Sequence, residues 1–309
     1  WTGSASTHNT AVGTFAMDAA MDGALRNVAM GYGSMGSLTT GDDNTAMGYL
    51  SLLSCATGAN NTCIGSLSGD AITGANDCVS LGYFSLSAAA TQTGTVAIGS
   101  AALAALTSGA GNTAVGYKSL YTSEANGDAC TAVGYEAMLT FNADADGHGE
   151  NTAVGYKAMR GTTTGVQSTA VGTWALGGAS TTGDSNTAIG YNSGQGITSG
   201  QDNVLVGAAS GDALTTGSEN VAIGLNALGQ HDTGARNIAI GYLAMNDTGH
   251  HADTRASTDN VFVGNTAGGG DWQSNDSNEN VGIGNYVMDG AMNAANSNTA
   301  LGHSALSAL

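Results

Sequence analysis

The segment Asn112-Thr113-Ala114-Val115-Gly116-Tyr117 decides the fold of this chain, because close copies of it recur from one end to the other. Its Gly returns about every seventeen residues, and seventeen copies fill the 309 residues. A short fixed period indicates one small structural unit stacked on itself. The anchor glycines are Gly13, Gly31, Gly48, Gly65, Gly82, Gly99, Gly116, Gly134, Gly155, Gly172, Gly190, Gly207, Gly224, Gly241, Gly264, Gly284 and Gly302.

Each copy has the pattern of a short strand that ends at the anchor Gly. The residue before this Gly is always apolar, as at Val115, and two residues earlier the slot holds Thr, Val or Ile, as at Thr113. Because side chains along a strand alternate between faces, these two slots share one face. Since Thr exchanges with the isosteric Val, we expect that face to point inward. We expect the slot between them, usually Ala as at Ala114, to point outward against a close neighbour such as another chain.

A second short segment follows the anchor Gly. Tyr comes directly after it in eight copies, and Ala or Ser and then Leu or Met follow at the third and fourth places, as at Ala137 and Met138. The Leu or Met is expected to fill a corner of the core. The Gly is expected to allow a bulge or a positive φ where the chain bends. A later Thr-Gly pair, as at Thr216-Gly217, predicts the return turn.

These features predict an all-β parallel β-solenoid of about seventeen 17-residue coils, folded as a single domain over residues 1–309. A helix is a poor alternative, because a Gly and a Thr-Gly pair in every coil leave no long uninterrupted stretch. Identical residues on successive coils should form ladders, with an amide ladder of Asn as a natural stabiliser. The predicted ladder residues include Asn44, Asn112, Asn186 and Asn220, with Gly116, Gly190 and Gly224 at the anchor position.

The phrases at Asn112–Gly116, Asn186–Gly190 and Asn220–Gly224 resemble the head repeats of YadA-like trimeric autotransporter adhesins. Similar Asn-Thr-Ala-Ile-Gly-Tyr repeats are typical of bacteriophage tail fibres. The resemblance covers the whole chain and implies a left-handed parallel β-roll, commonly trimeric, that presents an adhesive surface. The adhesin repeat is usually shorter than the repeat of this chain, so the strand lengths and the trimer contact can differ.

Composition narrows the classes of partner. The formal charge is −18 with only six Lys and Arg residues, so no basic stripe exists to track nucleic-acid phosphates or an anionic membrane. No apolar run has the length of a membrane span. The four cysteines, Cys55, Cys63, Cys78 and Cys130, are interpreted as small residues that fill repeat slots, and a bridge from Cys55 to Cys63 or Cys78 stays an alternative.

Longer spacings between anchor glycines predict loop insertions near residues 142–150, 249–258 and 270–279. The first insertion contains an Asn-x-Asp-x-Asp-Gly core that matches the opening of a calcium loop. Its candidate ligands are Asn142, Asp144 and Asp146, with Glu150 in place of the usual distal Glu. The alternative is a solvated acidic loop. Calcium is thus the one cofactor that the sequence suggests, and none is required.

The second and third insertions lie on successive coils and carry the least repetitive residues of the chain. We expect them to form a patch for a host-surface glycan or protein, with an aromatic side chain suited to such contacts. The alternative is a pair of tolerated loops without a ligand. The patch residues are His250, His251, Arg255, Asp271 and Trp272.

No arrangement of nucleophile, acid and base stands out, and repetition creates a surface of like groups, so an enzyme is not expected. The leading hypothesis is a structural and adhesive extracellular fibre, located at a microbial cell surface or on a virion. Its expected partner is itself, as a homotrimer or a head-to-tail filament, with no nucleic acid and no membrane insertion. Alternatives are a phage tail-fibre segment, an ice-binding solenoid with Thr ladders, and a calcium-stabilised spacer.

Overall fold

The computed structural model describes residues 5–88, 93–107, 109–122, 128–142, 149–246, 256–270, 272 and 276–307. These residues contain short strands and turns and no helix. The chain divides into two compact units, residues 1–151 and residues 152–309, and each is built from the same repeat.

Every copy of the repeat contributes one three-residue strand that ends directly before its anchor Gly. The strands of the first unit are β1 (Thr10–Val12), β2 (Val28–Met30), β3 (Thr45–Met47), β4 (Thr62–Ile64), β5 (Val79–Leu81), β6 (Val96–Ile98), β7 (Thr113–Val115) and β8 (Thr131–Val133). Those of the second are β9 (Thr152–Val154), β11 (Thr169–Val171), β13 (Thr187–Ile189), β14 (Val204–Val206), β15 (Val221–Ile223), β16 (Ile238–Ile240), β17 (Val261–Val263), β18 (Val281–Ile283) and β19 (Thr299–Leu301). A small parallel pair, β10 (Gly161–Thr162) and β12 (Ala179–Thr181), lies in the second unit.

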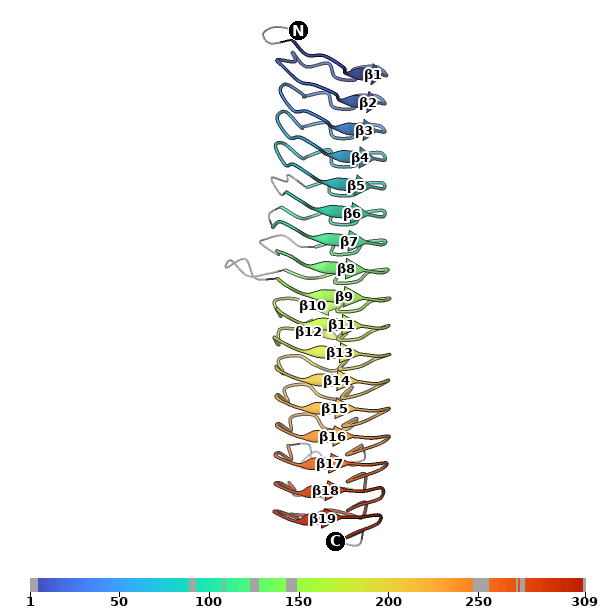
Figure 1. The fold of residues 1–309 in the computed structure, drawn as a ribbon, viewed down its shortest axis with the longest axis vertical. Helices are drawn as coiled ribbons and strands as arrows, with labels where there is room; N and C mark the ends of the chain where they lie inside the picture. The colour runs from blue at the N-terminus through green and yellow to red at the C-terminus, as the bar shows by residue number, and fades with distance from the viewer. Residues whose placement is uncertain are drawn as a thin grey trace. The chain divides into compact units, whose positions relative to one another are not determined.

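Within each unit, successive main strands pair in parallel and in register, so equivalent residues of neighbouring coils lie side by side (Figure 1). Thr113 pairs with Thr131, Ala114 with Ala132 and Val115 with Val133. The long Gly241–Gly264 spacing leaves this register intact, since Ile238 pairs with Val261. The prediction of an all-β parallel β-solenoid with about seventeen residues per turn is therefore confirmed.

The direction in which the strand side chains point differs from the sequence-based expectation. The middle slot of the strand, as at Ala114 and Ala222, is fully buried, whereas the flanking slots are half-buried or exposed. The prediction that the Thr/Val and Val/Ile slots face inward and Ala faces outward is wrong. The interior beneath the sheet is filled by other side chains, so the middle slot usually holds a small residue, and Leu205 and Phe262 are the larger exceptions.

The core consists of that middle slot, the third and fourth residues after the anchor Gly, and a further buried column about seven residues after this Gly, as at Ile72 and Leu214. Ala137 and Met138 are fully buried there, as predicted for the corner of the core. A larger core residue is accompanied by smaller neighbours. Phe262 replaces the usual Ala of the strand and lies between Gly268 and Gly282. A Cβ atom added to either Gly would lie 2.7 Å from the Phe262 ring. Volume is thus conserved across neighbouring coils.

The anchor glycines need their positive φ and their missing side chain. Gly116, Gly190 and Gly224 have φ values of +135°, +137° and +139°, and a Cβ atom on any of them would collide with the carbonyl of the next anchor Gly. The following turn also contains left-handed residues that are not Gly, such as Leu50 and Leu52 at φ 52° and 51°. This conformation is unfavourable for Leu, but hydrogen bonds between coils hold it.

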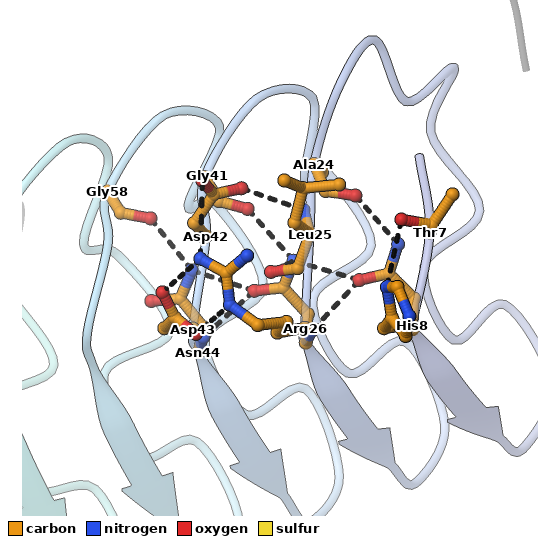
Figure 2. A network of polar contacts seen from close by, with 12 residues as sticks. Thr7, His8, Ala24, Leu25, Arg26, Gly41, Asp42, Asp43, Asn44 and Gly58 are labelled. Atoms are coloured by element: carbon orange, nitrogen blue, oxygen red, sulfur yellow. Dashed lines mark hydrogen bonds and ion pairs between the residues drawn. The ribbon is translucent and has the colours of Figure 1, made fainter. Parts of the chain in front are cut away.

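The Asn residue that opens the repeat is buried and links each coil to the next. Asn44 donates from its backbone N–H and from Nδ2 to Oδ1 of Asn27, at 2.9 and 3.0 Å. Its Nδ2 also donates to the carbonyl of Gly58 in the return turn, at 2.8 Å. Figure 2 shows Asn44 beside the Gly58 carbonyl of the next coil. The same pattern joins Asn203 to Asn186 and Asn220 to Asn203, and the Asn112 Oδ1 accepts from the Cys130 backbone at 2.9 Å.

Candidate binding surface

The outward face of the main strands is the most distinctive surface of each unit, and we call it the strand face. It comprises the first and third strand residues and the residue after the anchor Gly, and neither strand slot holds a charged residue in any coil. The exposed large apolar residues lie on this face or one position beyond it, with Leu306 as the exception among the described residues. They are Val12, Phe15, Val28, Met30, Tyr32, Tyr49, Ile64, Tyr83, Phe84, Tyr117 and Tyr135 in the first unit, and Val154, Tyr156, Val171, Ile189, Tyr191, Val204, Ile223, Leu225, Tyr242, Ile283, Tyr286 and Leu301 in the second.

Polar groups line one border of the strand face, in the turn that precedes each strand. Figure 2 shows the Arg26 guanidinium facing the Asp43 carboxylate of the next coil, with Nε–Oδ1 and Nη2–Oδ2 distances of 2.6 and 2.7 Å. This hydrogen-bonded pair keeps the pKa of Asp43 below its ordinary value. Asp42 Oδ1 accepts the Leu25 backbone N–H at 2.7 Å. Arg236 and Asp259 repeat the ion pair in the second unit, so these charges serve contacts between coils.

Aromatic side chains line the opposite border, directly after the anchor Gly. Tyr32 and Tyr49 stack with ring centroids 5.6 Å apart and planes at 17°. Tyr117 and Tyr135 stack at 5.2 Å and 23°. Register brings the rings together, because equivalent residues of neighbouring coils are held at strand spacing. All four side chains remain partly exposed, although stacking covers one face of each ring.

The two lysines of the chain both lie against this aromatic border. Lys118 places Nζ 5.4 Å from the Tyr117 ring centroid and 5.2 Å from that of Tyr121. Lys157 lies 4.9 Å from the Tyr156 centroid and 5.0 Å from that of Trp174. Each Lys follows a Tyr that follows an anchor Gly, so the short phrase Gly-Tyr-Lys marks both clusters in the sequence. Neither lysine was among the predicted site residues.

Two of the four candidate calcium ligands, Asp144 and Asp146, lie outside the described residues. Asn142 is exposed at the end of a described range. Glu150 is also exposed, and its backbone N–H donates to the Asp128 carbonyl at 3.0 Å, so it belongs to the coil. In the described part of the chain, no group of three or more His, Cys, Asp and Glu residues is arranged to bind a metal ion. The calcium loop stays a prediction.

Four residues of the predicted ligand patch, His250, His251, Arg255 and Asp271, also lie outside the described residues. The fifth, Trp272, is fully buried, so the expectation of an exposed aromatic at this position is wrong. Its indole N–H donates to the Gly268 carbonyl at 2.8 Å, and its ring meets Phe262 edge-on at a centroid distance of 6.0 Å. An indole ring buries much apolar area once its single polar atom is satisfied, which explains its inward position.

His231 is fully buried beside Trp272, with ring centroids 5.4 Å apart in an edge-to-face arrangement. Burial penalises the imidazolium and lowers the pKa of His231 to about 4. This histidine is therefore neutral at ordinary pH and acts as a core side chain. Its slot, seven residues after the anchor Gly, holds buried apolar residues in the preceding coils, such as Ile197 and Leu214, and this apolar column was the signal in the sequence for its burial.

All four cysteines are buried thiols, and Cys63 occupies the middle strand slot that usually holds Ala. Burial raises the pKa of Cys55 and of Cys130 to about 11 and raises that of Cys63 further. A thiol with such a pKa carries little thiolate at neutral pH and reacts slowly. The cysteines therefore act as small core residues.

No protein-family model matches the chain, and no curated protein matches it either. In the described residues, no helix has the length and apolar character needed to cross a membrane.

Proposed function

We propose that this protein is a non-enzymatic structural and adhesive fibre component that works outside the cell, at a microbial surface or on a virion. The observation that carries the proposal is the strand face, whose uncharged and mostly β-branched strand residues recur on every coil, with Tyr after the anchor Gly in eight of the seventeen copies. Repetition at strand spacing suits contacts that must extend over many equivalent positions, and it gives no reason to expect a catalytic centre. The resemblance to adhesin heads and tail-fibre repeats agrees with this role.

The occupant that we propose for the strand face is a second copy of the same chain. Three outward positions on eight strands of the first unit cover roughly 40 Å by 14 Å, or about 500 Å². The second unit has nine such strands, so its strand face covers about 600 Å². The strand face of each unit is therefore as large as the largest apolar patches on monomeric proteins, about 300–600 Å², and patches of that size are often functional.

The distribution of charge also supports a second copy of the chain as the partner of the strand face. The chain carries a formal charge of −18, which would oppose association through most of its surface. The strand slots contain no charge at all, and depletion of charge is typical of interface centres. Self-association through this face therefore avoids the repulsion that other faces would meet.

Sedimentation velocity between about 1 and 50 µM chain tests the proposal over the range in which a standard interface associates. We expect one oligomer of fixed size, reduced to monomer by the outward double substitution Ile189→Lys/Ile223→Lys. The matched control Ser199→Lys/Ser218→Lys adds the same charge in the return turns and should keep the oligomer. A wild-type monomer at every concentration would contradict the proposal, as would an oligomer that resists the outward lysines.

Ice binding is a second candidate, because the Thr columns that the sequence placed inside the core point outward. In the first unit these include Thr45, Thr62, Thr113 and Thr131, aligned at strand spacing. A thermal-hysteresis measurement separates the two functions. Hysteresis that disappears in Thr113→Tyr/Thr131→Tyr would favour ice binding, and its absence in the wild-type protein would remove this candidate.

A further inference from the structure

We propose that the second unit has a calcium site built from oxygen atoms of three successive coils, at Asp212, Gly229 and Asn246. These residues occupy the same slot, five residues after the anchor Gly, in the coils of β14, β15 and β16 (Figure 1). The slot lies outside the strand face, so the proposal is independent of self-association. It also uses none of the residues of the calcium loop that the sequence predicts near 142–150.

Three oxygen atoms converge on the space that Gly229 leaves by having no side chain. A Cβ atom at residue 229 would lie 2.5 Å from the Asn246 Oδ1, 3.2 Å from the Asn226 carbonyl oxygen and 3.5 Å from the Asp212 Oδ1. A carboxylate, an amide and a main-chain carbonyl are the kinds of oxygen ligand that Ca²⁺ takes in proteins. Asp212, Asn226 and Asn246 are only half-buried, so water can supply the remaining ligands from the solvent side.

Other glycines in the same slot do not face such a set of oxygens. A Cβ atom at Gly36 would lie closest to the Leu53 Cδ1, at 3.0 Å, and one at Gly177 would lie closest to the Trp174 ring, at 2.7 Å. None of the three atoms nearest to either position is a side-chain oxygen. The repeat alone therefore does not produce the arrangement, which depends on Asp and Asn in the coils on either side of Gly229.

The Asp212 carboxylate lacks a positively charged partner. Burial raises the pKa of Asp212 above its ordinary value, although backbone N–H groups of Asp212 and Ala213 partly oppose this effect. No Lys, Arg or His of the described residues lies within ion-pair distance of it. The Asn246 Oδ1 adds a second negative partial charge on the other side of Gly229. A divalent cation between them would compensate both groups.

A bound ion would join three coils that the backbone ladder already holds in register. Only one of the three oxygens belongs to an acidic residue, and few charged ligands give a weak calcium site. We therefore expect an affinity that suits the calcium concentrations outside cells. The ion should stabilise the coils of β14, β15 and β16 against local opening, because it binds only when the three oxygens are together.

The test measures calcium binding by isothermal titration on the full chain carrying Asp144→Asn/Asp146→Asn, so that the predicted calcium loop cannot contribute. We expect one ion per chain with a Kd of about 0.1–1 mM. CaCl2 at about 10 mM should raise the midpoint of thermal unfolding by about 2–4 °C relative to NaCl of equal ionic strength. Protection from hydrogen exchange should increase within residues 212–246.

Three substitutions in this parent alter the site in different ways. Asp212→Asn removes the charge and should weaken binding at least about tenfold. Gly229→Ala keeps every oxygen but fills the space between them, and should abolish binding. It should still fold, because Gly229 does not have a positive φ and the closest atom is the end of a flexible Asn side chain. Asn246→Asp adds a carboxylate and should tighten binding about tenfold.

Two matched controls address the same slot in the first unit. Asp70→Asn removes an equal charge where the neighbouring coils have Leu53 and Ser87, and Gly36→Ala adds an equal methyl group beside Leu53. Both should bind calcium as the parent does.

The proposal is overturned by the absence of saturable binding or by unchanged binding in Gly229→Ala. Equal weakening by Asp212→Asn and Asp70→Asn would also overturn it, since this would indicate diffuse attraction to an acidic surface. Weaker binding by Asn246→Asp would show that the amide N–H group, rather than the oxygen, faces Asp212. Sedimentation of the same samples reports on self-association separately.

Discussion

The Asn ladder is unbroken over most of the second unit and interrupted in the first. In the second unit the amides of Asn186, Asn203, Asn220, Asn237, Asn260 and Asn280 are buried and that of Asn298 is half-buried, and each after Asn186 donates to the amide before it. In the first unit the same slot holds Cys78, Thr95 and Cys130. The ladder continues across the 23-residue step from Asn237 to Asn260, with Nδ2–Oδ1 at 3.1 Å. Inserted residues therefore leave the ladder intact, whereas a substitution in its slot breaks it.

The largest effect is expected for Asn220→Ala. Its Nδ2 donates to Asn203 and Gly234, and its Oδ1 accepts from the backbone and side chain of Asn237. Loss of these buried bonds should lower the free energy of unfolding by about 3–5 kcal/mol, because several partners are left unsatisfied. Guanidinium denaturation with hydrogen-exchange mass spectrometry would measure and locate the loss.

Asn61→Ala tests the first unit at the coil where the ladder is interrupted. The next coil has Cys78 in the Asn slot, so the Asn61 Oδ1 accepts only the backbone N–H of Cys78 from that coil. Its cost should be smaller than that of Asn220→Ala by about 1 kcal/mol, the contribution of one hydrogen bond. Gln201→Ala, at an exposed position of the second unit, is the control and should change stability by less than about 0.5 kcal/mol. Equal costs for Asn61 and Asn220 would contradict the distinction between the two ladders.

Acidification should destabilise the second unit through His231, since the described core of the first unit contains no buried histidine. Its pKa falls from 6.5 to about 4 on folding, so the unfolded chain binds the proton more tightly. Stability is therefore unaffected above about pH 6.5 and decreases as the pH falls toward 4, by about 3 kcal/mol in total. Thermal unfolding at pH 7.5 and 4.5 should show that the wild-type protein loses more stability on acidification than His231→Leu does. Equal losses would show that His231 is not responsible.

Repair of the interrupted ladder should have a moderate stabilising effect. Thr95 Oγ1 is buried without a hydrogen-bond partner among the described residues. The double variant Cys78→Asn/Thr95→Asn places amides between Asn61 and Asn112, and it should raise the free energy of unfolding by about 1–2 kcal/mol. Protection from hydrogen exchange should increase in β5 and β6. A destabilised variant with unchanged core packing elsewhere would mean that the slot in the first unit cannot accept the amide.

The smallest effect is expected at the exposed ion pairs, where the two units are alike. Arg26 and Arg236 each form a bidentate contact with the Asp of the next coil, and both pairs are solvent-exposed. Exposed pairs contribute little because water and salt screen them. Arg26→Gln and Arg236→Gln should both unfold at a denaturant midpoint indistinguishable from that of the wild-type protein. A clear shift in one variant alone would indicate that its pair has a structural role.

The repeat made much of the fold predictable. The seventeen-residue period predicted the parallel coils, and the anchor Gly predicted the positive φ. Leu or Met at the fourth place predicted the buried corner of the core, as at Met138. The direction of the strand faces was mispredicted because Thr–Val exchange shows only that a site tolerates both residues. The space beneath the sheet decided the outcome, since it usually holds a residue as small as Ala114, with Leu205 and Phe262 as the larger exceptions.

The candidate surface was harder to predict for physical reasons. Trp272 was predicted to be exposed because it lies in a non-repetitive insertion. It is buried instead, since the core has room for its ring and its N–H donates to the Gly268 carbonyl. The Lys118 and Lys157 clusters had a signal in the phrase Gly-Tyr-Lys. Its meaning depended on the register that stacks Tyr117 on Tyr135, and sequence spacing alone does not give the orientation of rings.

Site-directed crosslinking tests most directly whether the strand face binds other copies of the chain. Ile189→Cys places a thiol on this face, and Ser199→Cys places one in an exposed return turn of the same unit. The native thiols are buried with raised pKa values, so they should not compete for a short bis-maleimide at neutral pH. We predict covalent oligomers from Ile189→Cys and none from Ser199→Cys. Crosslinking that is equal at the two positions, or confined to Ser199→Cys, would contradict the account.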